Sequence, residues 1–259
     1  MTEISSARDF QLLTKTFARA ATDTGVSFDF LVKTAARESG FRSEAKAAGS
    51  SAAGMFQFIE QTWLAMVSRY GAAQGLGAEA SAITRDESGR YAVKNSALKG
   101  QILNLRHDPK IATNMAAQLT LENTKVLRSK LGRAPTNGEL YVAHFMGAAS
   151  AGDLLQAARQ TPSMDATKLF PKQAAANPAI FSTSSGRTRT VAEVANNLVK
   201  AHSTVPEAGV DSATNQRSQP VATVLSGLAR SSILELSPMV IRLLSELSAP
   251  GAADRPLNK

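Results

Sequence analysis

One acidic side chain stands out because of the direction in which its predicted helix would point it. Glu38 shares a helical stripe with Leu31 and Ala35, so its carboxyl group is aimed at the protein interior. It also falls in the last turn of that helix, near the negative end of the helix dipole. Both surroundings disfavour a carboxylate anion, and a protonated carboxyl can donate to a leaving oxygen, as cleavage of a glycosidic bond requires. The same side chain could instead turn outward and pair with Arg37 or Arg42.

The residues after this carboxyl add groups suited to binding a sugar chain. Gly54 permits a close backbone approach, and the amide of Gln57 can donate to and accept from hydroxyl and N-acetyl groups. Met55 and Phe56 offer apolar surface for sugar faces, although either could equally belong to the core. Small residues over 47–53 would keep a groove open.

These residues carry a resemblance to a known family. Glu38-Ser39-Gly40-Phe41, then Gly54-Met55-Phe56-Gln57 and Thr62-Trp63, resemble the lytic transglycosylases of the soluble-lytic type (SLT domain) in the lysozyme-like superfamily. The family's usual Gly-Leu-Met-Gln motif has similar bulk at the two central positions. The resemblance implies that Glu38 is the catalytic acid and base, that Gln57 hydrogen-bonds the glycan, and that Ser39, Met55 and Phe56 lie against the substrate.

A second part of the resemblance lies at residues 139–147. Family members usually carry Ala-Tyr-Asn there, with the tyrosine hydrogen-bonded to the catalytic glutamate, whereas this chain has His144 and Phe145. It is similar to a His-Phe-x-Gly version found in some phage-type and proteobacterial members. His144 could donate to Glu38 in place of the tyrosine, or could be a satisfied core histidine. Tyr141, one turn earlier, is the second candidate for this hydrogen bond to Glu38. His144, Phe145 and Tyr141 are all candidate substrate-binding residues.

The resemblance implies a mechanism with one carboxyl group and no metal or cofactor. Glu38 would protonate the oxygen between N-acetylmuramic acid and N-acetylglucosamine, then deprotonate the muramic 6-hydroxyl to form a 1,6-anhydro ring. If Glu44, Glu60, Asp86 or Glu87 faced it across the cleft, water could react instead, and the protein would be a muramidase. An inactive peptidoglycan-binding or assembly protein is the alternative outside the enzymes.

The elements that must position these residues read as successive helices. Helical spacing of apolar residues, with caps such as Ser27 and Asp108-Pro109, predicts helices over 6–22, 28–38, 58–70, 111–131, 138–147 and 151–160. The glycine-rich stretch 71–109 is predicted to contain loop beside the cleft. Phe58 and Trp63 are predicted to be core residues. The expected fold is mainly α with little or no sheet, and the resemblance implies a lysozyme-like (goose-type or transglycosylase) domain with a groove.

Composition excludes several other classes of protein. The 259 residues are 43% apolar and contain no cysteine and only three histidines, which excludes disulfides, thiolate metal sites and cysteine nucleophiles. No stretch is long and apolar enough for a membrane span. The net charge of +8 belongs to residues 1–202, and its basic residues are too dispersed to predict nucleic-acid binding. Peptidoglycan glycan strands, with acidic stem peptides, are the expected partner.

The chain is predicted to divide near residue 203. The resemblance covers about 10–160 of a catalytic domain spanning 1–202, while 203–259 reads as a polar linker and an amphipathic helical tail. The substrate implies the periplasm or cell envelope, yet the first thirty residues carry charges where a classical signal peptide is apolar. We therefore expect a non-classical or specialised export route. The tail is expected either to pack against the main domain or to bind secretion or flagellar machinery.

Overall fold

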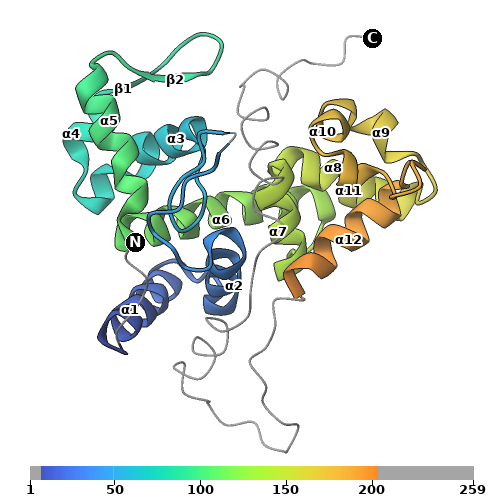
Figure 1. Ribbon diagram of the computed structural model, residues 1–259, viewed down its shortest axis with the longest axis horizontal. Coiled ribbons are helices and arrows are strands. Elements are labelled where there is room, and N and C mark those ends of the chain that lie inside the picture. Colours follow the sequence, from blue (N-terminus) through green and yellow to red (C-terminus); the bar gives the residue numbers. More distant parts are fainter. Residues whose placement is uncertain (1–6, 49, 204–259) are drawn as a thin grey trace, which may run out of the picture.

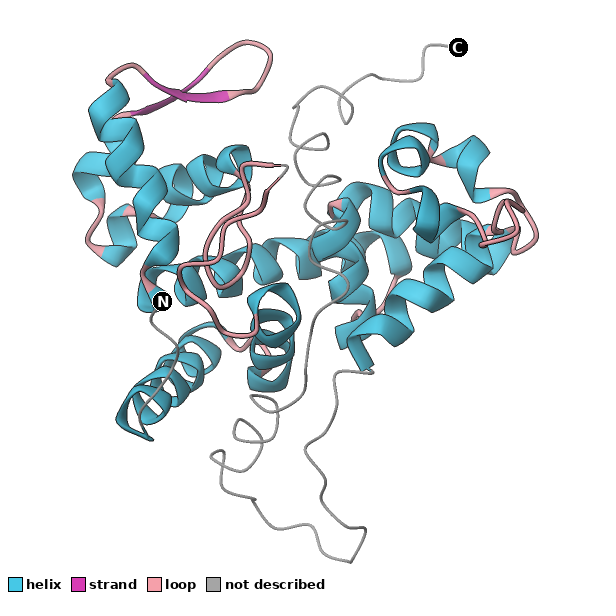
Figure 2. Cartoon of the chain, viewed as in Figure 1, coloured by secondary structure: helices cyan, strands magenta, loops and turns pink. Residues whose placement is uncertain are grey.

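The computed structural model describes residues 7–48 and 50–203, which fold into a mainly helical body with one small hairpin of strands (Figures 1 and 2). Strands β1 (Ile83–Arg85) and β2 (Tyr91–Val93) pair antiparallel. The prediction of a mainly α fold with little sheet is thus confirmed. The helices are α1 (Ala7–Thr24), α2 (Phe28–Ser39), α3 (Glu60–Tyr70), η1 (Ala72–Gln74), α4 (Gly77–Ser81), α5 (Ser96–Asn104), η2 (Leu105–His107), α6 (Pro109–Leu131), α7 (Asn137–Met146), α8 (Ala148–Gln160), α9 (Ala166–Leu169), α10 (Pro171–Ala176), α11 (Pro178–Phe181) and α12 (Val191–Ser203).

Helix α2, which carries Glu38, begins and ends where its local sequence directs. The Ser27 hydroxyl accepts a hydrogen bond from the backbone N–H of Phe30 at 3.2 Å. Gly40 ends the helix in the left-handed conformation, with φ 61°, and its N–H bonds back to the carbonyl of Ala36 at 2.9 Å. Because both ends are defined locally, Glu38 falls in the last turn of the helix, as predicted.

Among the described helices, the longest is α6, which runs through the middle of the molecule and packs against α1, α3, α7 and α8 (Figure 1). The Asp108 carboxylate caps it by accepting from the N–H groups of Lys110 (2.8 Å) and Ile111 (2.9 Å), with Pro109 in the first turn. Gly132 ends it with φ 69°. The predicted caps are confirmed, and the helix starts two residues earlier than expected.

Helix α7, which carries the second motif, is fixed at its start by a capping box. The Thr136 hydroxyl accepts from the N–H of Glu139 at 3.3 Å, and the Glu139 carboxylate accepts from the N–H of Thr136 at 2.8 Å. Helix α12 packs closely on this turn, since a Cβ at Gly138 would lie 2.7 Å from a methyl group of Val199. Helices α7, α8 and α12 therefore form one packed group (Figure 1).

The stretch 71–109, predicted to contain loop, instead consists of short elements joined by tight turns. Gly75 and Gly89 adopt positive φ angles of 80° and 81° at these turns. In the hairpin turn the Asp86 carboxylate accepts from the N–H of Arg90 at 2.8 Å. The glycines in this stretch indicate turns between short helices and strands, because these turns need residues in the left-handed conformation. The hairpin projects from the body above α3 and α5 (Figure 1).

Large apolar side chains gather in one core that joins the helices. Trp63 is fully buried, and its indole N–H donates to the carbonyl of Ile102 at 2.7 Å. Phe58 is 4% exposed and meets the Trp63 ring edge-on, with 5.1 Å between the ring centroids. The prediction that both are core residues is confirmed.

The predicted linker and tail lie almost wholly outside the described residues. Helix α12 ends at Ser203, one residue past the predicted boundary of the catalytic domain, and residues 204–259 are not part of the described structure. Within residues 7–48 and 50–203, no helix combines the length and the apolar character that crossing a lipid bilayer requires.

Candidate active site

The carboxyl group of Glu38 faces the protein interior, and only 1% of its side chain is exposed. Its Oε1 lies 3.4 Å from Nε2 of His144 on α7. The two arginines that could have drawn it outward are engaged elsewhere: Arg42 donates to a backbone carbonyl at the end of α2, and Arg37 donates to the hydroxyl of Tyr141. Helix α2 therefore presents the carboxyl to α7, as its apolar stripe predicted.

Tyr141 is the second α7 residue beside this carboxyl group. Its hydroxyl hydrogen-bonds Glu38 and accepts from Nε of Arg37 at 2.8 Å. Burial raises the pKa of Tyr141 above its ordinary 10.0 and the charge of Glu38 raises it further, while Arg37 opposes both. Tyr141 thus keeps its proton and donates it to Glu38. The ring of His144 lies nearly parallel to it, with centroids 6.1 Å apart. Both candidates from the second motif reach the carboxyl group.

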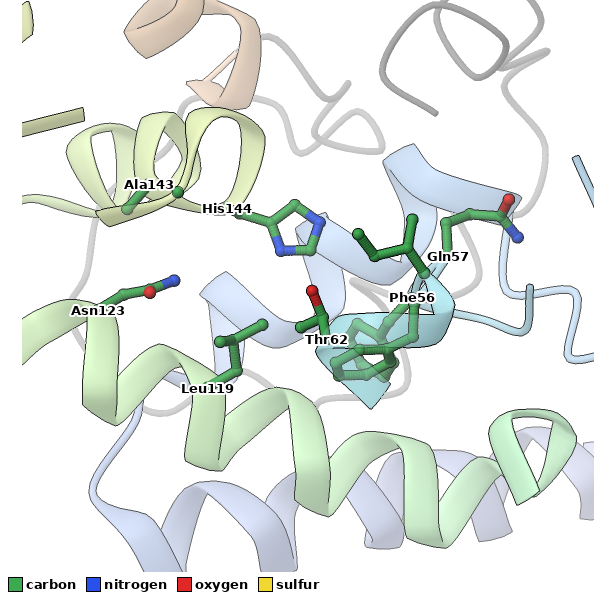
Figure 3. A pocket seen from close by; sticks show the side chains of 10 residues that line it. Phe56, Gln57, Thr62, Leu119, Asn123, Ala143 and His144 are labelled. Atoms are coloured by element: carbon green, nitrogen blue, oxygen red, sulfur yellow. The ribbon is translucent and has the colours of Figure 1, made fainter. Parts of the chain in front are cut away.

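A pocket opens next to these groups, between α3, α6, α7 and the loop before α3 (Figure 3). Its wall is mostly apolar, and Thr62, Asn123 and His144 contribute polar atoms, a composition typical of a small-ligand site. None of the ten described residues that line it carries a carboxylate. They are Phe56, Gln57, Phe58, Ile59, Thr62, Leu119, Asn123, Ala143, His144 and Gly147.

The part of this pocket that comes from α6 was not predicted from the sequence. Leu119 and Asn123 lie one turn apart and both line it. Asn123 is 8% exposed and continues a stripe that also includes Met115 and Leu127, both fully buried. An amide within such an apolar stripe is the signal that could have identified it, because a buried amide needs partners.

Ser39 and Gln57, predicted to lie against the substrate, have internal partners. The Ser39 hydroxyl donates to the carbonyl of Met55 at 2.9 Å, which joins the end of α2 to the loop before α3. The Gln57 side-chain nitrogen donates to the carbonyls of Gly54 (2.7 Å) and Ala45 (3.3 Å). This amide nitrogen is engaged within the loop. The other atoms of Gln57 are therefore the ones that can line the pocket.

Gly54 is needed for packing within the protein. Its φ is 80°, and a Cβ there would lie 2.0 Å from the backbone carbonyl oxygen of Arg106 in η2. The Arg106 guanidinium in turn donates to the carbonyls of Ser51 and Phe58, at 2.5 and 3.0 Å. The close approach that this glycine permits is therefore to η2, and it fixes the loop that forms one wall of the pocket.

The three apolar residues predicted to contact the substrate are each 1% exposed. Phe56 meets Phe17 edge-on, with 6.0 Å between ring centroids, and also lines the pocket. Met55 and Phe145 point into the core and do not line the pocket. The structure therefore brings only Phe56 of the three to the candidate site.

None of the other carboxylates considered for a second catalytic role is among the described residues that line the pocket. Glu60 pairs with Lys99 at 2.6 Å, and Glu44 lies 3.9 Å from His107. Residues 86 and 87 lie in the turn of the hairpin, where both are exposed. Within the described part of the chain, no group of three or more His, Asp and Glu side chains could hold a metal ion.

A comparison of the sequence with models of known protein families finds no match.

Proposed function

We propose that the protein is a peptidoglycan lytic transglycosylase of the soluble-lytic type, with a lysozyme-like catalytic domain and with Glu38 as its acid and base. One observation carries the proposal. A buried carboxyl at the end of α2 lies 3.4 Å from a histidine that lines a pocket, and it hydrogen-bonds a buried tyrosine. Buried carboxyls with such partners are typical of sites that transfer protons.

The proposed reaction needs no group beyond the substrate and these side chains. The Glu38 proton goes to the oxygen between N-acetylmuramic acid and N-acetylglucosamine as the bond from that oxygen to the muramic C1 breaks. The carboxylate that remains then accepts the proton of the muramic 6-hydroxyl, whose oxygen bonds to C1 and closes the 1,6-anhydro ring. The proton taken from the hydroxyl restores the acid for the next cycle.

The positions of the carboxylates other than Glu38 favour a transglycosylase over a muramidase. Hydrolases of glycosidic bonds usually place a second carboxylate about 5 to 10 Å from the first. Besides Glu38, which lies behind His144, the carboxylates considered are placed elsewhere: Glu60 is held by Lys99, and Glu44 and residues 86 and 87 are exposed. A reaction in which the substrate supplies its own nucleophile, the 6-hydroxyl, is the one that a single carboxyl can support.

The substrate implies where the protein acts. The partner is the glycan strands of peptidoglycan, in the periplasm or cell envelope. The net positive charge of residues 1–202 suits the acidic stem peptides of these strands. A role of residues 203–259 in binding export or flagellar machinery remains part of the proposal, to be tested with a chain truncated after Ser203.

The test is mass analysis of the soluble products released from purified peptidoglycan. Wild type is expected to release anhydro-muropeptides and Glu38→Gln none, because the amide cannot donate and then accept the proton. Glu44→Gln is the matched control, since Glu44 is exposed and lies beside His107, and it should retain activity. Reducing muropeptides would instead indicate a muramidase, and no product from the wild type would favour a peptidoglycan-binding protein.

A further inference from the structure

The Glu38 carboxyl and the pocket are not in direct contact. The Glu38 side chain is 1% exposed and is not among the residues that line the pocket. His144 touches both: its ring lines the pocket, and its Nε2 lies 3.4 Å from the carboxyl oxygen. In this arrangement a sugar oxygen in the pocket meets the imidazole before it meets the carboxyl group.

The two ring nitrogens of His144 face different surroundings. Nε2 is buried without a hydrogen-bond partner among the described residues and lies 3.4 Å from Oε1 of Glu38. Nδ1 lies on the other side of the ring, and Figure 3 shows that edge turned toward Thr62 and Asn123 across the pocket. A neutral imidazole has one nitrogen that donates and one that accepts, so it can take up a proton at one edge while it releases another from the opposite edge.

The surroundings of His144 hold the ring in this orientation. The ring of Tyr141, one turn earlier on α7, lies nearly parallel to it at an interplanar angle of 19°. The hydroxyl of Tyr141 is occupied by Glu38 and Arg37. The charged or titratable groups that face this cluster are Glu38 and Arg37 from α2, Tyr141 from α7 and His202 from α12, whose ring lies 5.4 Å from that of Tyr141.

We propose that His144 is a second catalytic residue, which carries protons between Glu38 and the substrate. The inference rests on the proposed function and adds a residue to its mechanism. In the first step the Nδ1 proton moves to the bridging oxygen as its bond to C1 breaks, and the Glu38 proton moves to Nε2. In the second step Nδ1 takes the proton of the 6-hydroxyl as its oxygen bonds to C1, and Nε2 returns its proton to Glu38. Every proton and bond is balanced over the cycle.

The competing role for His144 is a cover that must turn aside before Glu38 can reach the substrate. The two roles predict opposite results when the ring is removed. Without a proton carrier the buried carboxyl loses its route to the sugar, whereas without a cover the carboxyl becomes more accessible and turnover is kept or increased.

The first measurement is the steady-state release of anhydro-muropeptides by wild type, His144→Ala and His144→Gln. Both variants should lose about 10²- to 10⁴-fold in kcat, with KM little changed. Added imidazole should restore part of the turnover of His144→Ala, where it can occupy the vacated space, and none of that of Glu38→Gln. The glutamine variant keeps a polar side chain of similar size, so it serves if the alanine variant unfolds.

The second measurement does not depend on turnover. The ¹⁵N resonances of the His144 ring, assigned with His144→Gln, should move in Glu38→Gln and stay unchanged in Glu44→Gln. The latter should move those of His107, which lies 3.9 Å from Glu44. Unmoved His144 resonances in Glu38→Gln would overturn the coupling of the pair.

The outcomes separate the two proposals. A wild-type protein that releases no product overturns the proposed function and, with it, this role of His144. An active wild type with full turnover in His144→Ala, or without rescue by imidazole, overturns the proton-carrying role alone.

Discussion

At the scale of single residues, the carboxyl group of Glu38 takes its setting from a few polar side chains. Tyr141 can donate only one hydrogen. Its oxygen accepts from Arg37, and a guanidinium can accept nothing in return, so the hydroxyl proton is directed to the carboxyl. Arg37 also donates through Nη1 to the carbonyl of Ala201 at 2.6 Å, which fixes the guanidinium between α2, α7 and α12. Arg37 is thus a positioning residue that acts through the tyrosine.

Replacing Arg37 with glutamine should lower kcat by about 10- to 100-fold, because hydrogen bonds to a charged group are lost from the site. The change should also raise the pKa of Tyr141 further, since Arg37 is the neighbour that lowers it. The measurements are kcat on purified peptidoglycan and the ¹³Cζ resonance of Tyr141, assigned with Tyr141→Phe.

The matched control for that substitution is Arg189→Gln. Arg189 likewise makes two hydrogen bonds, in its case to the backbone carbonyls of Ala179 and Ile180, and it does not line the pocket. This variant should keep the wild-type kcat and Tyr141 resonance. Equal losses of kcat in the two variants would mean that Arg37 has only a structural role.

At the scale of elements, the loop between α2 and α3 forms one wall of the site. Two non-glycine residues in it, Phe41 and Gln57, adopt positive φ angles of 64° and 49°. Backbone bonds within the loop, such as Gly54 N to Ala45 O at 2.8 Å, hold it in that shape. The buried guanidinium of Arg106 then ties it to η2. This wall is therefore shaped before a ligand arrives.

The contact of Gly54 with η2 can be isolated by a pair of substitutions. Gly54→Ala and Gly75→Ala both place a side chain at φ 80°, which costs about 1–2 kcal/mol. A Cβ at Gly75 would meet nothing within 4 Å, whereas one at Gly54 would clash with Arg106. Urea unfolding should show that Gly54→Ala lowers the free energy of unfolding by about 1–3 kcal/mol more than Gly75→Ala does. Equal losses would show that the loop moves away from η2 without cost.

At the scale of the whole molecule, α12 returns from the far end of the described chain to pack behind the site. Its carbonyl at Ala201 binds Arg37. The ring of His202 lies 5.1 Å from that of Phe30 and 5.4 Å from that of Tyr141, measured between centroids. The resemblance covers only about residues 10–160, yet this later helix contacts Arg37 and Tyr141, the side chains next to Glu38.

The burial of His202 should make stability depend on pH. Burial lowers its pKa from the ordinary 6.5 to about 4, so the unfolded chain binds more protons between these two values. The neutral, buried His202 therefore contributes at most about 3 kcal/mol to the free energy of unfolding. This contribution is complete above pH 6.5 and is lost as the pH falls toward 4.

Urea unfolding at pH 7.5 and pH 4.5 would measure this loss. His202→Phe keeps an aromatic ring against Phe30 and does not titrate, so its free energy of unfolding should fall less between the two pH values. An equal fall in both proteins would contradict the prediction. His107→Phe serves as the control. It removes a different histidine, whose Nδ1 is hydrogen-bonded to the carbonyl of Ser43.

The sequence by itself determined the features that depend on neighbours along the chain. Ser27 and Asp108 begin their helices as predicted, and Gly40 and Gly132 end the same two helices, because a cap is formed by groups a few residues apart. The apolar stripe of α2 was also enough to turn Glu38 inward, since helical spacing alone decides which face a residue occupies.

Only the tertiary structure decided which side chains complete the site. Asn123 and Ala201 come from α6 and α12, and no spacing along the chain relates them to Glu38. Arg37 is the neighbour of Glu38 on α2, but its bonds to Tyr141 and Ala201 depend on how α7 and α12 pack against that helix. The tertiary structure also turned Met55 into the core, because the loop before α3 packs against η2 as well as against α2. Contacts of this kind depend on how the helices pack together, and local pattern carries no information about that packing.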